Sequence, residues 1–333
     1  MRGAAAAFVL ATTLSVSAQD LHFSHFFSTP LSVNPAFTGY FPGCYRIGIN
    51  MRNQWRSITV PYKTLSVYAD GNVSDVWEFD KVGIGGILLH DNAGDGRLRT
   101  TRAMLSGAVH KGFGEHLVLS FGINGGLTQK KLDFTALIFD DQWTGTSFDP
   151  SVTTSEPGTT DPLAYYDVQV GGIAAWNTER DDVFFASISG VHLLTPKESF
   201  YELDNQVGVR PVFYGGAYIN LPDRFGENLV AEPALFYMRQ KRAQEFFIGA
   251  NVSKLMIGPL DYVTGGLWFR ASGDAIPVVG GSYKSVRMLL SYDINVSRLR
   301  TASHLRGGFE LSLRYIHRCE EPSWELVPPC IRF

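Results

Sequence analysis

The sequence has little net charge, few cysteines and no long hydrophobic run beyond its first residues. Its 333 residues include 29 Lys and Arg against 32 Asp and Glu, a formal net charge of −3. This balance excludes a nucleic-acid binder driven by bulk charge. Beyond the N-terminus no run of about 18 apolar residues occurs, which excludes a bundle of membrane helices. With 45% hydrophobic residues, the chain is also too apolar to be intrinsically disordered.

Aromatic residues and glycine are plentiful, with 23 Phe, 14 Tyr, 6 Trp and 34 Gly. In residues 45–52 every odd position is apolar, and every even position is Arg, Gly or Asn. A period of two residues is typical of a strand with one apolar and one polar face. No segment after the N-terminal run shows a convincing helical period. The composition and the period together indicate a β protein.

Roughly fourteen segments follow this alternation, and most are about 10–16 residues long, against about 5–6 for strands of soluble proteins. A tilted strand needs about 9–11 residues to cross a membrane. We therefore predict an all-β fold, a transmembrane antiparallel β-barrel of about 14 strands with short N- and C-terminal periplasmic segments. A soluble sandwich or propeller is the alternative, although the chain lacks the repeated motif of propeller blades. The segments lie near 44–53, 61–71, 81–91, 97–113, 115–131, 163–178, 181–194, 207–222, 228–240, 244–257, 259–271, 273–284, 286–298 and 305–317.

The lengths of the connections predict the orientation. If the N-terminus starts in the periplasm, the two longest connections, about 132–162 and 195–206, both fall on the extracellular side, where barrels carry long loops. The first of these connections holds six acidic residues and no Lys or Arg. Such a loop is usually just solvated, and a contact with a partner or a cation is the alternative.

Because the outward face of a barrel meets lipid, the alternate polar residues should face the lumen. These residues carry charges of both signs, which can pair with each other. The inward candidates are Arg46, Asn50, Arg52, Asp70, Asp167, Glu232, Asp293, Glu310 and Arg314. Aromatic residues near strand ends should form the interfacial girdles, and the candidates are Trp55, Tyr62, Trp176, Tyr201, Tyr237 and Trp268.

The N-terminus predicts export to the cell envelope. Arg2 is followed by an apolar run of small residues and then by Val16-Ser17-Ala18, which fits a signal-peptidase site. A buried N-terminal helix is the alternative. We predict a signal peptide (1–18), a plug-like periplasmic segment (19–43), an outer-membrane barrel (44–317) and a periplasmic tail (318–333).

No motif for catalysis, a cofactor or a metal is apparent. The chain lacks a nucleophile elbow, a Ser-His-Asp context and a phosphate loop. Residues 91–96, with the sequence DNAGDG, lack the spacing and the Glu of a calcium loop and match a hairpin turn better. The Gly-rich residues 83–86 indicate a strand interior with a close approach of backbone. We therefore expect no enzyme, with catalytic, cofactor-binding and metal residues all absent.

Several motifs in order along the mature chain resemble one family. Residues 34–39 read NPAFTG, residues 52–55 read RNQW and residues 61–64 read PYKT. Weaker matches follow at 127–134, 140–142, 274–276 and 291–293. This pattern resembles the PorP/SprF family of the type IX secretion system of gliding and secreting Bacteroidetes.

The resemblance implies an integral outer-membrane barrel that supports type IX protein secretion or gliding motility. It implies partners among the periplasmic subunits of the machine and a secreted adhesin or other cargo, with outer-membrane lipid around the barrel and no nucleic acid. It implies no catalytic residues and no cofactors. The alternative is an outer-membrane transport channel for small or apolar solutes, similar to fatty-acid channels. A second alternative, an outer-membrane hydrolase, would need a Ser-His pair at the outer rim, and none is apparent.

The family motifs have plausible structural or interaction roles, carried by Asn34, Pro35, Gly39, Arg52, Asn53, Gln54 and Trp55. Asn34 and Pro35 favour a turn, and Gly39 permits a tight bend. Since the segment before the first strand is rich in Phe, we expect it to pack into the barrel or against its rim, and a loosely ordered tail is the alternative. Arg52 is expected to make hydrogen bonds in the lumen or at its rim, and Trp55 to anchor at the membrane interface.

Three cysteines lie in a compartment that permits disulfides. Cys319 and Cys330 bracket the C-terminal tail, and we predict a disulfide between them as the first choice. Because barrel closure brings the first and last strands together, a bridge from Cys44 to either of them is the second choice, and three free thiols are the third. The tail is expected to dock periplasmic subunits.

Overall fold

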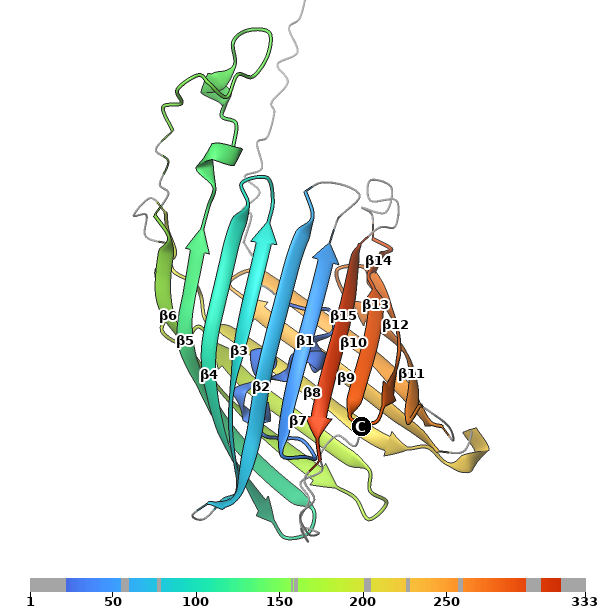
Figure 1. The fold of residues 1–333 in the computed structure, drawn as a ribbon. Helices are drawn as coiled ribbons and strands as arrows, with labels where there is room; N and C mark the ends of the chain where they lie inside the picture. The colour runs from blue at the N-terminus through green and yellow to red at the C-terminus, as the bar shows by residue number, and fades with distance from the viewer. Residues whose placement is uncertain are drawn as a thin grey trace, which may run out of the picture.

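The computed structural model describes residues 22–54, 60–76, 79–156, 158, 161–200, 205–225, 228–256, 260–297 and 307–318. Their strands form one closed antiparallel barrel (Figure 1). Strands β1 to β13 pair in sequence order, β14 pairs with β12, and β15 pairs with both β13 and β1. The strands are β1 (Tyr45–Gln54), β2 (Tyr62–Val76), β3 (Phe79–Ala93), β4 (Leu98–Phe113), β5 (Leu117–Lys131), β6 (Leu163–Asn177), β7 (Val183–Val191), β8 (Arg210–Asn220), β9 (Leu229–Gln240), β10 (Ala243–Leu255), β11 (Tyr262–Arg270), β12 (Asp274–Tyr283), β13 (Val286–Tyr292), β14 (Ile294–Asn295) and β15 (Gly308–His317).

The two short elements β13 and β14 are one barrel strand interrupted at Asp293. Both pair with β12 in a single register, Ser291 opposite Val278 and Ile294 opposite Ala275. At the interruption the Asp293 amide still donates to the Gly308 carbonyl oxygen of β15, at 2.7 Å. The described barrel therefore has fourteen strands, and the predicted fold class and strand number are confirmed.

The alternation in the sequence becomes an inner and an outer face. Ile84, Leu105 and Ile188 point outward and are 66%, 78% and 65% exposed, as expected of side chains that meet lipid. Of the nine polar residues predicted to face the lumen, eight are buried and Arg314 is half-buried. The prediction of the inward face is confirmed.

The prediction that Trp268 belongs to the interfacial girdle is wrong. This residue is 2% exposed and lies on the inner face of β11, in phase with Thr264 and Arg270, which are also buried. Residues 267–269 are all apolar, so the local sequence does not show which of them faces lipid. Trp176 is 50% exposed, as a girdle residue requires, and Tyr62 and Tyr237 are half-buried. Trp55 and Tyr201 lie outside the described residues.

We call the end of the barrel where β1 begins and β15 ends the inner end, and the opposite end the outer end. The connection from Lys131 to Leu163 and that from Val191 to Arg210 are both at the outer end. Figure 1 shows the first of these rising beyond the neighbouring strands. Among the described residues, none of the helices has the length and apolar character to cross a bilayer.

Candidate functional site

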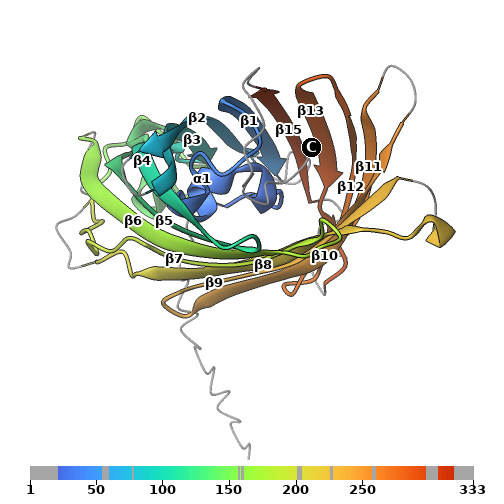
Figure 2. The same cartoon turned by 90° about the horizontal axis from the view of Figure 1, so that it is seen from below.

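Residues 22–43 fold inside the ring of strands, toward β1–β6 (Figure 2), and we call them the plug. The plug contains η1 (Phe26–Ser28), α1 (Pro30–Val33) and η2 (Pro35–Phe37). It runs from His22, 2.8 Å from Glu245 at the outer end of β10, to Gly43 and Cys44 at the inner end. These elements are too short to be stable alone, so contacts with the barrel wall hold their shape.

Asn34 in the NPAFTG motif links the plug to two strands. Its side-chain oxygen caps η2 by accepting from the Ala36 amide, at 2.9 Å. Its Nδ2 donates to the carbonyl oxygens of Gly172 in β6 and Ile188 in β7, both at 3.1 Å. Pro35 occupies the first turn of η2, where its missing N–H costs nothing.

Asn34→Ala is expected to remove the cap and the two donors at once, which costs about 2–3 kcal/mol of plug docking. The expected result is faster protease cleavage within residues 22–43, while the barrel keeps its resistance to SDS before heating. Asn205, which is exposed in the outer connection between β7 and β8, supplies the matched control, Asn205→Ala. Unchanged cleavage of the Asn34 variant would contradict the role assigned to this side chain.

Glycines on the inner faces of β3, β5 and β6 let the plug approach the backbone of the wall. A Cβ at Gly83 would collide with the Thr38 carbonyl group, one at Gly122 with the backbone of Pro35 and Ala36, and one at Gly171 with the Asn34 side chain. The close backbone approach predicted for residues 83–86 is therefore present at Gly83. Gly39 itself has φ +72°, and its amide donates to Asp70 at 2.8 Å.

A buried ion pair holds the plug near the inner end. Arg46 on β1 donates to both carboxylate oxygens of Asp70 on β2, at 2.9 and 2.7 Å. The same guanidinium donates to the Phe37 carbonyl oxygen of the plug, at 3.1 Å. Both charged side chains are 2% exposed or less. A buried pair of this kind is stable only when its remaining donors and acceptors are used, and the plug backbone uses them.

A second set of charges, which we call the outer charge network, consists of Arg52, Arg270, Asp293 and Glu310. Arg52 and Arg270 approach the Asp293 carboxylate at 3.0 and 3.2 Å, and Arg52 also lies 3.3 Å from Glu310. Glu310 accepts hydrogen bonds from two consecutive plug amides, those of Ser24 at 2.7 Å and His25 at 2.8 Å. Burial lowers the pKa of the His25 side chain, and the nearby carboxylates of Glu310 and Asp293 oppose this effect.

Aromatic rings fill the space between the plug and β8–β11. Phe26 stacks on Phe236, with 4.6 Å between ring centroids, and meets Trp268 edge-on at 5.3 Å. Phe27 stacks on Trp268, with 5.2 Å between ring centroids. Each such pair adds about 0.5–1.5 kcal/mol beyond its buried area. Trp268 is therefore a lumen contact of the plug.

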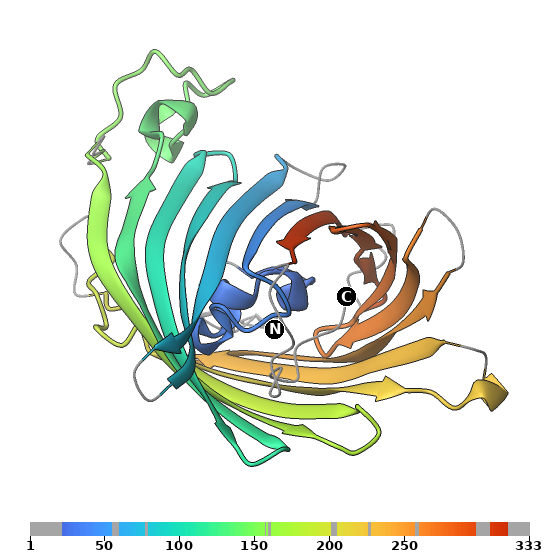
Figure 3. The same ribbon diagram turned by 60° about the horizontal axis from the view of Figure 1, so that its bottom comes forward.

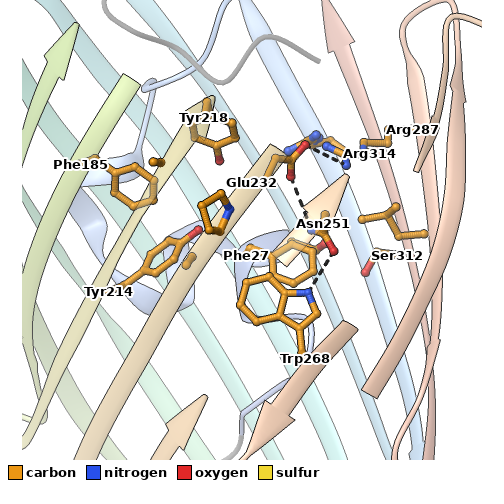
Figure 4. Close-up of a pocket in the computed structure, with 15 residues that line it drawn as sticks. Phe27, Phe185, Tyr214, Tyr218, Glu232, Asn251, Trp268, Arg287, Ser312 and Arg314 are labelled. Atoms are coloured by element: carbon orange, nitrogen blue, oxygen red, sulfur yellow. Dashed lines mark hydrogen bonds and ion pairs between the residues drawn. The ribbon is translucent and has the colours of Figure 1, made fainter. Parts of the chain in front are cut away.

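A hollow remains between the plug and the β7–β15 part of the wall (Figure 4), and we call it the inner pocket. Phe27, Trp268 and Tyr214 form its aromatic side, and Figure 4 shows Glu232, Arg287 and Arg314 together on the other. Arg287 lies 3.5 Å from Glu232. The described lumen is therefore partly filled by the plug and partly lined by mixed charges, unlike a continuous apolar path.

The connection of residues 132–162 at the outer end, which we call the outer arm, folds on itself. Gln142 accepts from the Phe139 amide and donates to the Val152 carbonyl oxygen, at 2.9 and 2.8 Å. The rings of Trp143 and Phe148 lie 5.0 Å apart, and both remain about half exposed, as does Ile138. The arm thus presents apolar side chains on an acidic loop.

Asp141 clamps the outer arm by accepting from Ser155 N at 2.6 Å and from Thr154 Oγ1 at 2.9 Å. These hydrogen bonds, above all that of the Ser155 amide, lower the pKa of Asp141 below its ordinary value. Because the pKa of Asp141 is lowered, its carboxylate gives its full stabilisation at a pH above the ordinary pKa of an Asp. The stabilisation is lost as the pH falls through the lowered pKa. We expect hydrogen exchange at residues 152–156 to follow its intrinsic pH dependence from pH 7 to about 5, and to show extra loss of protection below about pH 4.

Asp141→Asn should show this loss of protection at neutral pH. The neighbouring exposed Asp140, changed to Asn, is the matched control and should leave the exchange unchanged. Equal exchange in the two variants would show that the carboxylate of Asp141 does not hold the arm.

The remaining residues of the sequence motifs lie apart from each other. Arg52 faces the lumen as part of the outer charge network, whereas Asn53 is on the opposite face of β1 and Gln54 ends that strand. Trp55, Cys319 and Cys330 lie outside the described residues, as does the predicted signal peptide. The structure does not bring the RNQW residues together as one site.

Cys44 at the start of β1 is disulfide-bonded. Its amide donates to the His317 carbonyl oxygen of β15 at 2.9 Å. The predicted bridge between Cys319 and Cys330 lies outside the described residues.

The sequence reasoning missed the wall residues that receive the plug. Gln169 and Ser189 donate to the Val33 carbonyl oxygen, at 3.0 and 2.6 Å, and Asn124 donates to that of Leu31 at 3.3 Å. His110 lies 2.9 Å from the Thr38 carbonyl oxygen. The sequence feature that could have identified these wall residues is a polar side chain at an inward-facing position of an alternating strand. Within the described ranges, no group of three or more His, Cys, Asp or Glu side chains is placed to hold a metal ion.

Comparison with solved structures shows the fold. A TodX deltaS2S3 mutant monoaromatic hydrocarbon channel is 11% identical at a TM-score of 0.51, over 86% of this chain and 93% of that one. A Pseudomonas aeruginosa FadL homologue is 10% identical at a TM-score of 0.48, over 85% and 92%. No protein with a curated function matches significantly.

The family comparison covers most of the sequence. The description "Type IX secretion system membrane protein PorP/SprF" matches residues 15–315, a span that includes the plug and the barrel strands up to Tyr315 in β15. The match and the barrel fold agree with an outer-membrane component. The chain belongs to the PorP/SprF family of type IX secretion system membrane proteins.

Proposed function

We propose that this protein is a non-enzymatic outer-membrane subunit that supports export or surface placement of type IX cargo through protein–protein contacts. The observation that carries the proposal is the plug. It is fixed by the buried pair of Arg46 and Asp70 and by the outer charge network, and it fills part of the lumen through which a solute would have to pass. A barrel with a fixed plug offers its two ends as contact surfaces.

The outer arm is the surface that we assign to a secreted adhesin or other cargo. Exposed aromatic residues that are held in place by a folded scaffold are typical of protein-contact sites. Trp143 and Phe148 fit that description because Gln142 and Asp141 fix the arm around them. The periplasmic subunits of the machine are assigned to the inner end.

The experiment is a clean deletion with complementation. Loss of the protein is expected to abolish export of a type IX cargo, or gliding, while other outer-membrane proteins keep their levels. A complementing Trp143→Ala, Phe148→Ala double variant should assemble as a barrel and lose cargo placement, and Phe113→Ala at the inner end is the control. A strain that exports and glides normally but loses uptake of a small apolar solute would instead support the channel alternative.

A further inference from the structure

The outer half of β6 has a neighbouring strand on one side only. Its residues 163–176 pair with β5, whereas its pairing with β7 covers residues 170–177. Residues 163–169 therefore extend beyond β7 toward the outer end of the barrel, and we call them the β6 edge. Figure 3 shows the outer arm joining β6 at this end.

The chain leaves the β6 edge after β7 because its next residues are held over the lumen. Directly after β7, His192 has φ +60°, and its Nδ1 lies 2.6 Å from the Asp167 carboxylate on the inner face of β6. Farther along, Glu198 accepts hydrogen bonds from Lys130 of β5 at 2.6 Å and from Tyr165 of β6 at 3.0 Å. The connection from β7 to β8 is thus tied to the inside of the wall and does not continue the pairing with β6.

Two residues of the β6 edge direct their backbone groups toward the side that β7 leaves open. The Leu193 amide donates to the Val168 carbonyl oxygen at 3.1 Å, so the backbone groups of Val168 point to this side. Because these directions alternate along a strand, those of Tyr166 and Ala164 point the same way. Within the described ranges, no residue bonds to the backbone N–H or C=O groups of these two. Each of them therefore offers one donor and one acceptor to a further strand.

Apolar side chains surround this open side. Tyr166 is 74% exposed, and Leu193 and Leu194, which follow β7, are 39% and 54% exposed. An unpaired backbone group is costly in lipid, and an exposed sheet edge is a template for a strand of another chain. An extended segment presents its N–H and C=O groups at the two-residue repeat that the edge requires. The β6 edge therefore fits an extended segment with apolar side chains.

The outer arm indicates the charge of that segment. The arm enters β6 at Leu163, its exposed residues include Asp140, Glu156 and Asp161, and residues 132–162 contain no Lys or Arg. A second copy of this chain in the same membrane would bring its own acidic arm to the same place, and like charges disfavour that pairing. The chemistry favours a segment of a different protein, with Lys or Arg beside its apolar residues.

We propose that the β6 edge binds an extended segment of an exported protein, which adds to the outer end of the barrel wall as one further strand. The backbone of this segment pairs with Tyr166 and Ala164, its apolar side chains cover Tyr166 and Leu194, and its basic side chains face the outer arm. The proposal rests on the proposed function, because it names how the cargo is recognised.

A proline at position 164 tests the backbone pairing. Ala164→Pro removes an N–H that points away from β5, so the hydrogen bonds between β5 and β6 remain. Ala164→Val keeps the N–H and is the matched control. In the complemented deletion strain, antibody labelling should find at least about tenfold less cargo on cells with the proline variant than with the control, because the incoming strand loses a hydrogen bond and its fit. Both variants should keep the gel mobility of a folded barrel.

The outcomes of this test separate the two proposals. If the deletion abolishes export and the two variants place equal amounts of cargo, the pairing at the β6 edge is wrong and the role in secretion stands. Normal export by the deletion strain would overturn both proposals.

Cross-linking tests the location without relying on the proline variant. A photoreactive p-benzoylphenylalanine replaces Tyr166 in the full-length protein, in cells that are exporting cargo. Irradiation and mass spectrometry are expected to find a cross-link to a type IX cargo, within a segment that has apolar residues at alternate positions. The same group at Leu105 on β4, which is 78% exposed on the lipid face, is the control and should give none. Cross-links from position 166 only to a second copy or to another part of this chain, or none to a cargo, would overturn the proposal.

Discussion

Deleting residues 22–43 should convert a closed barrel into a conducting one. The segment fills the lumen beside β1–β6, and a barrel of about fourteen strands is wide enough to leave an aqueous path, so we expect at least roughly a tenfold rise in single-channel conductance in planar bilayers. The barrel itself should still form, because its hydrogen bonds run from strand to strand and none is supplied by the plug.

The control for this deletion is the shift in gel mobility on heating, which reports a folded barrel independently of conductance. Gly122→Leu provides a second route to the same state, because a side chain there overlaps the backbone of Pro35 and Ala36 and should displace the plug without removing it. Gly107→Leu is the matched control on β4, where a Cβ meets nothing closer than 3.8 Å. A folded deletion variant with the conductance of the full-length protein would show that the plug does not close the lumen.

Glu310→Ala should be the most destabilising single change in the lumen. It removes the acceptor of two plug amides and takes a partner from Arg52 inside a buried site. Loss of one member of a buried charged network costs about 3–5 kcal/mol. The expected result is a lower midpoint for urea unfolding in detergent, together with release of the plug to protease.

The urea unfolding midpoint of Glu310→Gln should lie between those of the unaltered protein and Glu310→Ala, because an amide oxygen can still accept one of the two hydrogen bonds. Glu115→Ala, at an exposed position in the turn between β4 and β5, is the matched control and should change stability by less than about 0.5 kcal/mol. If Glu310→Ala unfolds at the midpoint of the control, the network contributes no net stability, and its role is limited to positioning the plug.

The barrel could be predicted from the sequence because it depends on one local property, the alternation of apolar and polar residues along each strand. A strand that separates lipid from lumen must alternate at every second residue, and this alternation is visible in residues 45–52 without any knowledge of their neighbours. The same parity identified Arg46, Asp70, Asp293 and Glu310 as inward residues. Two turns with positive φ, at Gly94 and Gly114, also fall at Gly residues in the predicted connections.

Alternation fails where both faces are apolar, which explains the error at Trp268. Its outward neighbours Leu267 and Phe269 meet lipid, whereas Trp268 itself meets the plug rings Phe26 and Phe27. A lumen position next to a plug accepts an apolar side chain as readily as a lipid-facing position does. Only the pairing of β11 with β10 and β12 shows which face of β11 meets lipid and which faces the lumen.

The partners of the plug depended on closure of the whole barrel. Asn34 lies 138 and 154 residues before the carbonyl groups that it binds, and Ser24 lies 286 residues before Glu310. No local rule relates such distant positions, because their contact requires every intervening strand to take its register. The sequence by itself thus determined the strands, their faces and the family, and the tertiary structure decided how the N-terminal segment is held.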